Sequence, residues 1–406
     1  MARTSFPGVL RNATLLTVFT LASLSAARGQ YRELYDFPNS NIDGGVILDS
    51  AGNIYGATDE GGGASGGVVF ELVMPGDSLN ILHTFNGSPD GAGPNAPLVF
   101  DRAGNLYGTT YIGGAYNAGT VFMMSPALGG QWLERVLYSF TGGPDGGYPQ
   151  AAVLLDNSGH LYGTTTAGGT YGQGVVYRLN ISAVPLATTL HSFGAPGDGI
   201  GQTGSLVADA AGNLYGTTYS GGASQLGTAY ELSPTNIGSG WAETVLWSFP
   251  GTEYDGENPV GGLVFNAYGY LVGAAEHGGT YGLLCQSGNC GALFALVPLR
   301  GGWSEYVLYA YEMNPCDHPV GPLAIESSLE SSKAYYPDLS GGNGGGCLDE
   351  AVPREYGEWL PEDLDYFPNE PGLQPNGGVV VDRQGNIYGT YSSQNYAAVY
   401  EFTPLD

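Results

Sequence analysis

The stretch LVFDRAGNLYGTT, residues 98–110, contains an apolar run, a polar turn and a second apolar run. Valine, phenylalanine, leucine, tyrosine and threonine in short runs favour β-strands. Asp101 can cap a tight turn with its side chain, and Gly104 can adopt the positive φ that such a turn requires. The stretch therefore predicts two antiparallel strands joined by a short hairpin turn.

The same motif recurs along the chain. Its copies occupy residues 46–58, 98–110, 153–165, 206–218, 263–275 and 379–391, with a diverged copy at 323–339. Their first apolar runs end at Asp49, Asp101, Asp156, Asp209, Asn266, Glu326 and Asp382, which lie 52 to 60 residues apart. Repetition at this period indicates an array of similar structural units.

Each copy continues in one order, with a Gly-Gly loop, a third run such as GTVFMM at 119–124 and a fourth run such as RVLYSF at 135–140. Short β-rich runs bounded by Gly, Pro, Asn and Asp, with no helical period, predict strands. Four antiparallel strands per repeat are typical of a propeller blade. We therefore predict an all-β, seven-bladed β-propeller with four-stranded antiparallel blades over residues 30–406, with a degenerate sixth blade at about 312–375.

The two ends of the chain predict how the ring closes. Residues 32–37, RELYDF, match the fourth run, whereas residues 398–402, AVYEF, match the third. We expect the N-terminal strand to complete the last blade, with Leu34 and Val399 in one sheet, because this pairing removes two free sheet edges. The second runs carry a mid-strand glycine, such as Gly108, at which we expect a neighbouring blade to approach closely.

The net charge of the chain and its N-terminal segment indicate where the protein is located and which kinds of partner it can bind. The chain has 38 acidic and 11 basic residues, a net charge of −27 and 42% hydrophobic residues. This charge disfavours nucleic acids and anionic membranes, and it suits divalent cations, neutral glycans or cationic partners. Residues 1–29 have the basic start, apolar centre and small residues of a signal peptide, which predicts a secreted or periplasmic protein. We expect no membrane insertion after cleavage and no C-terminal anchor. We also expect a monomer.

The cysteines are even in number, which favours disulfides in an exported chain. They are Cys285, Cys290, Cys316 and Cys347. Of three possible pairings we favour Cys285–Cys290 with Cys316–Cys347. A zinc site formed by these residues is disfavoured, because their spacing is not Cys-x-x-Cys.

The motif Asp-x-x-Gly-Asn-Leu-Tyr-Gly-Thr-Thr, followed by Gly-Gly, Gly-Thr-Val-Phe and Val-Leu-Tyr-Ser-Phe, resembles the GloVer tandem repeat. The resemblance covers nearly the whole mature chain. It implies an exported bacterial repeat protein and implies no particular reaction.

Two sets of residues recur on the loops that a propeller would gather on one face. Loops between consecutive copies carry Asp90, Asp145, Asp198 and Asp255. These loops and the Gly-Gly loops carry Tyr111, Tyr116, Tyr148, Tyr171, Tyr219, Tyr254 and Tyr281. The aspartates either cap Pro-Asp-Gly turns or form a carboxylate rim for a cation or polar ligand. The tyrosines either shield the blade ends or bind a glycan or peptide.

The sequence favours an exported, non-catalytic binding or scaffold protein, and we assign no catalytic residue, metal ligand or cofactor. Calcium would suit a carboxylate rim, but no EF-hand spacing is present. The histidines, His83, His160, His191, His277 and His318, are interpreted as structural. An alternative is a propeller hydrolase or lyase acting on polysaccharide at the degenerate repeat, through Asp317, His318, Asp338, Asp349, Glu350 and Glu355. A structural matrix protein is a third possibility.

Overall fold

A computed structural model describes most of the chain after the predicted signal peptide. The described residues are 29–60, 66–181, 185–202, 204–235, 240–252, 255–278, 291–310, 318–327, 332–338, 346–353, 359–366, 374–375, 377–393 and 396–405. All regular structure in these ranges is β-strand. Within them, no helix has the length and apolar character needed to cross a membrane.

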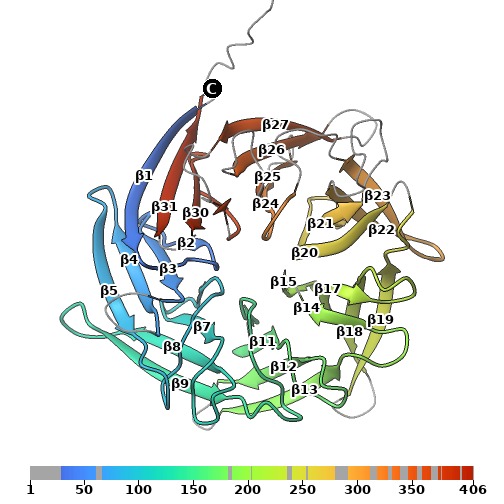
Figure 1. Cartoon of the computed structure of the whole chain (residues 1–406), viewed down its shortest axis with the longest axis horizontal. Helices are drawn as coiled ribbons and strands as arrows, with labels where there is room; N and C mark the ends of the chain where they lie inside the picture. The colour runs from blue at the N-terminus through green and yellow to red at the C-terminus, as the bar shows by residue number, and fades with distance from the viewer. Residues whose placement is uncertain are drawn as a thin grey trace, which may run out of the picture.

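The strands form seven sheets in a ring, each built on four antiparallel positions, and three of the sheets contain a fifth short strand (Figure 1). Blade 1 contains β2 (Val46–Leu48), β3 (Ile54–Thr58), β4 (Val68–Val73) and β5 (Ser78–Thr84). Blade 2 contains β6 (Val99–Phe100), β7 (Leu106–Thr110), β8 (Thr120–Pro126) and β9 (Trp132–Ser139). Blade 3 contains β10 (Leu154–Leu155), β11 (His160–Thr164), β12 (Val175–Asn180) and β13 (Leu186–Ser192).

The second half of the ring repeats this order with split inner strands. Blade 4 contains β14 (Gly199–Gln202), β16 (Val207–Ala208), β17 (Leu214–Gly221), β18 (Thr228–Pro234) and β19 (Trp241–Ser248). Blade 5 contains β20 (Gly256–Phe265), β21 (Leu271–Gly278), β22 (Ala292–Leu299) and β23 (Gly302–Ala310), and β15 (Gly204–Ser205) pairs with β20 in parallel. Blade 6 contains β24 (Ala324–Ser327), β25 (Ser332–Asp338), β26 (Cys347–Pro353) and β27 (Trp359–Tyr366). Blade 7 contains β28 (Gln374–Pro375), β29 (Val380–Val381), β30 (Ile387–Ser393), β31 (Tyr396–Pro404) and β1 (Gly29–Pro38).

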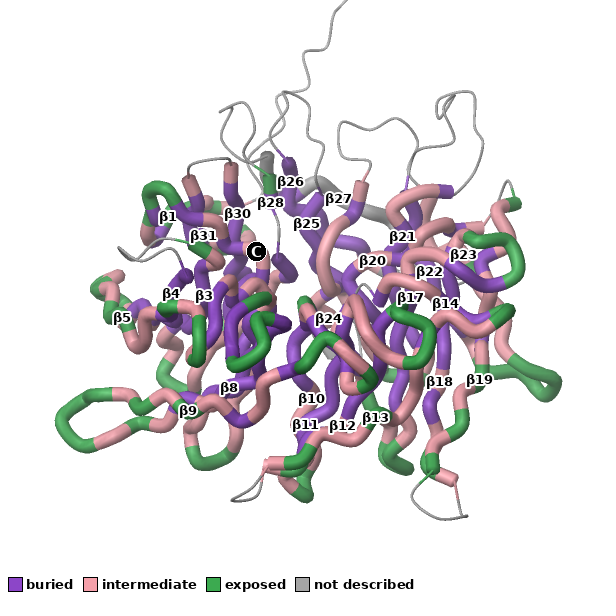
Figure 2. The backbone as a smooth tube through the Cα atoms, turned by 60° about the horizontal axis from the view of Figure 1, so that its bottom comes forward, coloured by how far each residue is buried: buried purple, intermediate pink, exposed green. Residues whose placement is uncertain are grey.

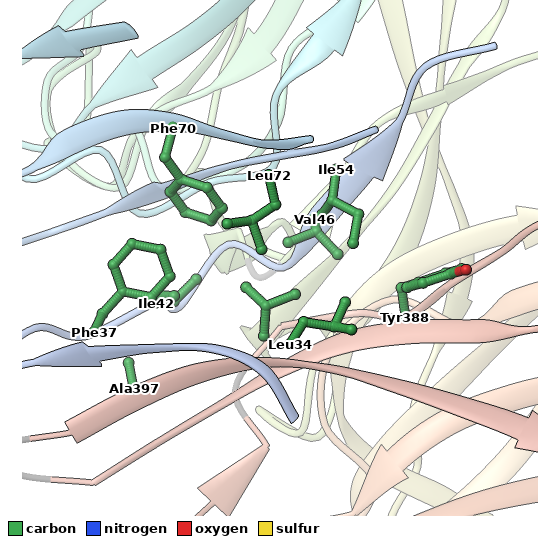
Figure 3. Packing of buried hydrophobic residues seen from close by; sticks show 10 residues of the cluster. Leu34, Phe37, Ile42, Val46, Ile54, Phe70, Leu72, Tyr388 and Ala397 are labelled. Carbon is green, nitrogen blue, oxygen red and sulfur yellow. The ribbon is translucent and has the colours of Figure 1, made fainter. Parts of the chain in front are cut away.

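The ring closes between the two ends of the chain, as predicted. In Figure 1, β1 runs beside β31, and the register places Tyr35 opposite Val399. Leu34 packs in the same buried cluster as Val399. Figure 3 shows Leu34 in this cluster with Val46 of β2, Ile54 of β3 and Leu72 of β4. Arg32 contacts both Glu401, at 2.8 Å, and Asp77 of blade 1, at 2.9 Å. The N-terminal strand therefore joins the last blade to the first.

The recurrent turn has the predicted chemistry. Asp101 Oδ1 accepts hydrogen bonds from the backbone N–H of Ala103 at 2.8 Å and of Asn105 at 2.9 Å. Asp101 Oδ2 accepts from Asn105 Nδ2 at 2.7 Å and from the Tyr107 hydroxyl at 3.1 Å. Gly104 has a φ of +85°. One carboxylate thus fixes the turn and anchors the strand that follows, which explains why the motif recurs.

The mid-strand glycines have a different role from the one predicted. A Cβ on Gly108 would lie 2.5 Å from Cζ of Phe122, its cross-strand partner in the same blade, and 2.8 Å from Leu98 of that blade. The same pairing joins Gly56 to Phe70, Gly163 to Tyr177, Gly216 to Tyr230, Gly273 to Phe294 and Gly389 to Tyr400. The expectation of a neighbouring blade at this point was wrong. The glycine makes room for an aromatic ring of its own sheet.

The sixth blade replaces both members of this pair. Tyr336 occupies the glycine position of β25, and Asp349 occupies the aromatic position opposite it in β26. Both are buried, at 0% and 1% exposure. The aromatic ring has therefore moved from the third strand to the second. Across the ring, buried residues follow the strands, and the exposed residues concentrate at the loops (Figure 2).

Candidate functional site: one loop face

The connections between blades and the loops after the second strands lie together at one end of the ring. Short bridges join Ala92 to Ile112 and Gly147 to Ala167, each linking a blade connection to the following blade's Gly-Gly loop. The described members of both predicted residue sets therefore belong to one surface, hereafter the loop face. Tyr254 and Tyr281 lie outside the described residues.

Two of the predicted aspartates cap their own turns. Asp145 Oδ2 accepts hydrogen bonds from the Tyr138 hydroxyl and the Thr141 backbone N–H, both at 2.9 Å, and the Thr141 hydroxyl also donates to this carboxylate. Burial raises the pKa of Asp145, but these hydrogen bonds outweigh it, and the pKa lies below its usual range. Asp255 similarly accepts a hydrogen bond from the Thr252 hydroxyl. These contacts match the turn-capping interpretation.

The other two aspartates contact histidines of the preceding fourth strand. His83 Nε2 lies 3.2 Å from Asp90 Oδ2, and His191 Nε2 lies 3.1 Å from Asp198 Oδ2. Backbone N–H groups of the turn also donate to these carboxylates, from Asn86 at 3.2 Å and from Gly194 at 3.0 Å. The Asp198 side chain is 4% exposed and that of His191 is 18% exposed, so this pair is largely shielded from water.

A glutamate from the next blade completes each histidine–aspartate pair. Glu134 of β9 joins His83 and Asp90, and Glu243 of β19 joins His191 and Asp198, with the ligand atoms of each group within 4.8 Å of one another. Oε1 of each glutamate is buried and receives no hydrogen bond. Burial first, and then the nearby aspartate charge, raise the pKa of both glutamates to about 7.

The sequence carried a signal for these glutamates that our prediction did not use. Trp-x-Glu begins the fourth run three times, at Trp132–Glu134, Trp241–Glu243 and Trp303–Glu305. The glutamate of each lies in the blade after the aspartate it meets, so linear spacing gives no indication of the contact.

Two further blade interfaces show what happens without histidine. Between blades 4 and 5, Trp247 replaces the histidine and donates from Nε1 to Glu305 Oε2 at 2.8 Å, while the Gly256 N–H donates to Glu305 Oε1 at 3.1 Å. Between blades 2 and 3, Tyr138 replaces it, and Ala187 occupies the glutamate position. Where histidine is missing at these two interfaces, the glutamate is thus hydrogen-bonded or absent.

The described tyrosines form an aromatic rim on the loop face. The Tyr111 and Tyr148 rings lie 5.4 Å apart. Tyr116 is 64% exposed and Tyr171 is 52% exposed. Tyr219 is half-buried, and its carbonyl accepts a hydrogen bond from Asn258 Nδ2 at 2.9 Å. The rim therefore contains both packed and freely accessible rings.

Tyr148 adopts a backbone conformation that side chains rarely take. Its φ is +58°, and its backbone N–H donates a hydrogen bond to the Ala118 carbonyl, in the loop that also carries Tyr116. The equivalent positions, identified by the same hydrogen bond or by position in the repeat, are Gly93, Gly201 and Asn258. Glycine and asparagine tolerate this conformation, whereas a bulky side chain costs on the order of 1 kcal/mol. The chain holds this ring in place at an energetic cost.

The central channel contains a cavity of about 440 Å³, lined by residues that precede or belong to the inner strands of all seven blades. Asp43, Asn95, Gln150 and Gln202 supply polar side chains to it, and Val260 and Val320 supply apolar ones. Small residues bring the inner strands together: a Cβ on Gly377 would lie 2.1 Å from the Gly45 nitrogen.

Three acidic residues of the sixth blade whose burial is described are largely enclosed by the sheet. Asp338, Asp349 and Glu350 are 0%, 1% and 6% exposed. Asp338 Oδ1 accepts a hydrogen bond from the His318 N–H at 2.8 Å, and Lys333 pairs with Glu350 at 2.7 Å. Asp317 and Glu355 lie outside the described residues. So do Cys285, Cys290 and Cys316, while Cys347 is buried in β26, and the two disulfide pairings stay predictions.

Comparison with known proteins agrees with the repeat and the fold. The family model described as the Gloeobacter/Verrucomicrobia repeat matches residues 16–135 and 129–346. No curated protein matches the sequence. An ancestral GH74 enzyme is similar in structure, with a TM-score of 0.59 at 12% identity, over 91% of this chain and 48% of that one. A PL25 ulvan lyase bound to a GlcA–Rha3S oligosaccharide is similar with a TM-score of 0.56 at 11% identity, over 92% of this chain and 95% of that one. At these identities the likeness concerns the fold alone, and this chain spans about half the length of the GH74 enzyme.

Proposed function

The chain belongs to the Gloeobacter/Verrucomicrobia repeat family, and we propose that it is an exported, non-catalytic module that binds a neutral glycan on the tyrosines of its loop face. The observation that carries the proposal is Tyr148, a ring held at positive φ where equivalent repeat positions have glycine or asparagine. Backbone strain kept at one repeat and absent from the others suggests a use for that side chain.

The neighbouring rings support a carbohydrate ligand. Tyr111 packs beside Tyr148, and the exposed rings of Tyr116 and Tyr171 lie on neighbouring loops of the same face. Tyrosine offers a flat apolar surface and a hydroxyl, a combination that suits the faces and hydroxyls of a sugar. The net charge of −27 disfavours an anionic glycan, so a neutral one is favoured.

A glycan array with the purified mature protein tests the proposal. We expect a neutral oligosaccharide to bind, and Tyr148→Gly to weaken that binding at least tenfold without lowering the melting temperature, because glycine relieves the strain. Tyr268→Ala is the matched control, since Tyr268 is 77% exposed but lies on a hairpin turn between β20 and β21. Binding that survives Tyr148→Gly, or binding only to cationic peptides, would contradict a glycan site at these rings.

Catalysis on polysaccharide at the sixth blade is the alternative function. It requires carboxylates that a substrate can reach, and the described candidates there are almost fully buried. Turnover of a polysaccharide that Asp338→Asn abolishes, in a protein that remains folded, would favour this alternative over the binding module.

A further inference from the structure

We propose that the two histidine–aspartate–glutamate groups are first-row divalent metal sites, with Zn²⁺ the best-matched ion, each joining two adjacent blades. The first consists of His83, Asp90 and Glu134, and the second of His191, Asp198 and Glu243. Neither depends on the glycan proposal, because no tyrosine of the rim contributes a ligand atom.

The geometry suits a small cation with nitrogen and oxygen ligands. Zinc bound to imidazole and carboxylate at about 2.0–2.2 Å holds neighbouring ligand atoms roughly 3.3–3.6 Å apart. The histidine–aspartate distances of 3.2 Å and 3.1 Å are already close to this value. The third ligand atom lies within 4.8 Å of the other two in each group.

The buried glutamate oxygens give an independent reason for a cation. Oε1 of Glu134 and Oε1 of Glu243 are shielded from water and receive no hydrogen bond, and each carboxyl lies beside a second carboxylate. Two carboxylates whose oxygens lie within 4.8 Å of each other repel, and a proton or a cation between them removes this repulsion. A metal ion satisfies both oxygens at once, and the charge of −27 favours its capture.

The other interfaces serve as controls within the same chain. Glu305 occupies the same position as Glu134 and Glu243, but Trp247 stands where the histidine would be and donates to it. The interface with Tyr138 has no glutamate at all, because Ala187 replaces it. A glutamate oxygen that is shielded from water and lacks a hydrogen-bond donor thus occurs, at these four interfaces, only opposite a histidine.

The ligand types select the class of metal. Imidazole with two carboxylates suits zinc and its first-row neighbours, whereas calcium and magnesium prefer sites made only of oxygens. Three protein ligands leave a fourth position for water, and the histidines, 22% and 18% exposed, leave a route for the ion. Because the glutamate comes from the following blade, the ion would clamp blade 1 to blade 2 and blade 3 to blade 4.

Metal counting on tag-free protein, stripped with a chelator and dialysed against micromolar Zn²⁺, tests the proposal. We expect two zinc ions per chain, one in His191→Ala and in Glu243→Gln, one in His83→Ala and in Glu134→Gln, and none in the double histidine variant. Glu305→Gln, the matched control, should retain both ions. Millimolar Ca²⁺ should displace neither.

Each other outcome overturns all or part of the proposal. Absence of zinc, or its displacement by calcium, refutes both sites. A count that His191→Ala and Glu243→Gln leave unchanged refutes the second site, and the corresponding result for His83→Ala and Glu134→Gln refutes the first. If a histidine variant fails to fold, the isosteric glutamine variant decides. Co²⁺ bound to the wild-type protein should give a visible absorption band that weakens by half in each single-site variant.

Discussion

Tyr35 lies opposite Val399 in a sheet whose strands come from the two ends of the chain. Leu34, next to Tyr35, is 7% exposed and packs among residues of blades 1 and 7. Closure of the ring therefore buries an apolar side chain of β1, the strand that is farthest in sequence from its pairing partner. A circular arrangement of blades depends on this pairing, because in every other blade the antiparallel strands come from one stretch of the chain.

Shortening a buried side chain of β1, the strand that closes the ring, should destabilise the whole propeller. We expect Leu34→Ala to lower the free energy of unfolding by about 2–5 kcal/mol, through lost burial and the cavity that remains. Urea denaturation followed by tryptophan fluorescence measures the change. Leu128→Ala is the control, because Leu128 is 97% exposed, and it should change stability by less than about 0.5 kcal/mol. Equal midpoints for the two variants would show that the end strand contributes little.

A methyl group at the mid-strand glycine should collide with the aromatic ring opposite. Gly108→Ala places its Cβ 2.5 Å from Phe122 and 2.8 Å from Leu98, and we expect a loss of about 1–3 kcal/mol from overpacking. Gly301→Ala has no atom within 4 Å of its Cβ and should be neutral. The same denaturation experiment compares the two. A tolerated Gly108→Ala would mean that the Phe122 ring moves aside freely.

The sequence predicted those features that repeat or that are local. The turn at Asp101 was predictable because its donors lie within six residues, and the closure was predictable because each chain end matched a different strand of the repeat. The propeller followed from these two patterns together.

Side-chain contacts between blades could not be predicted from the repeat pattern. Glu134 meets Asp90 only because the ring brings one blade's fourth strand against the preceding blade's connection. Likewise, Gly108 resembled a site of approach between blades, and only the strand register showed that Phe122 of the same sheet fills the space. The positive φ of Tyr148 could not be read from the residue itself. The glycine and asparagine at the equivalent positions of other repeats were the only indication of it in the sequence.

The turn carboxylate should be worth more than a single hydrogen bond. Asp101→Ala leaves two backbone N–H groups, the Asn105 amide and the Tyr107 hydroxyl without their shared acceptor, and we expect a loss of about 1–3 kcal/mol. Asp101→Asn should cost less. Blade 5 has this replacement naturally, with Asn266 Oδ1 accepting from the N–H groups of Tyr268 and Tyr270 at 3.0 Å. Melting temperatures should follow the order wild type, asparagine, alanine, and equal values for the last two would contradict the role of the side-chain oxygen.

Metal-free protein should be more stable at pH 5 than at pH 8. Burial, aided by the charge of Asp255, raises the pKa of Glu305 to about 8, from an ordinary value of 4.5. Between these values the unfolded chain has lost this proton and the folded chain keeps it, so stability falls as pH rises through the window. The raised pKa values of Glu134 and Glu243, about 7, and of Asp59, about 6, act in the same direction.

Glu305→Gln isolates this contribution, because glutamine cannot ionise. One proton changes stability by up to about 1.4 kcal/mol per pH unit, and we expect the variant's decline between pH 5 and pH 8 to be shallower than that of the wild type. Urea denaturation in the presence of a chelator at pH 5, 6, 7 and 8 measures both slopes. Below about pH 4 both proteins should lose stability together, because the hydrogen-bonded carboxyls of Asp101, Asp145 and Asp209, whose pKa values lie below their usual range, become protonated. Parallel slopes above pH 5 would place the titrating group elsewhere than at Glu305.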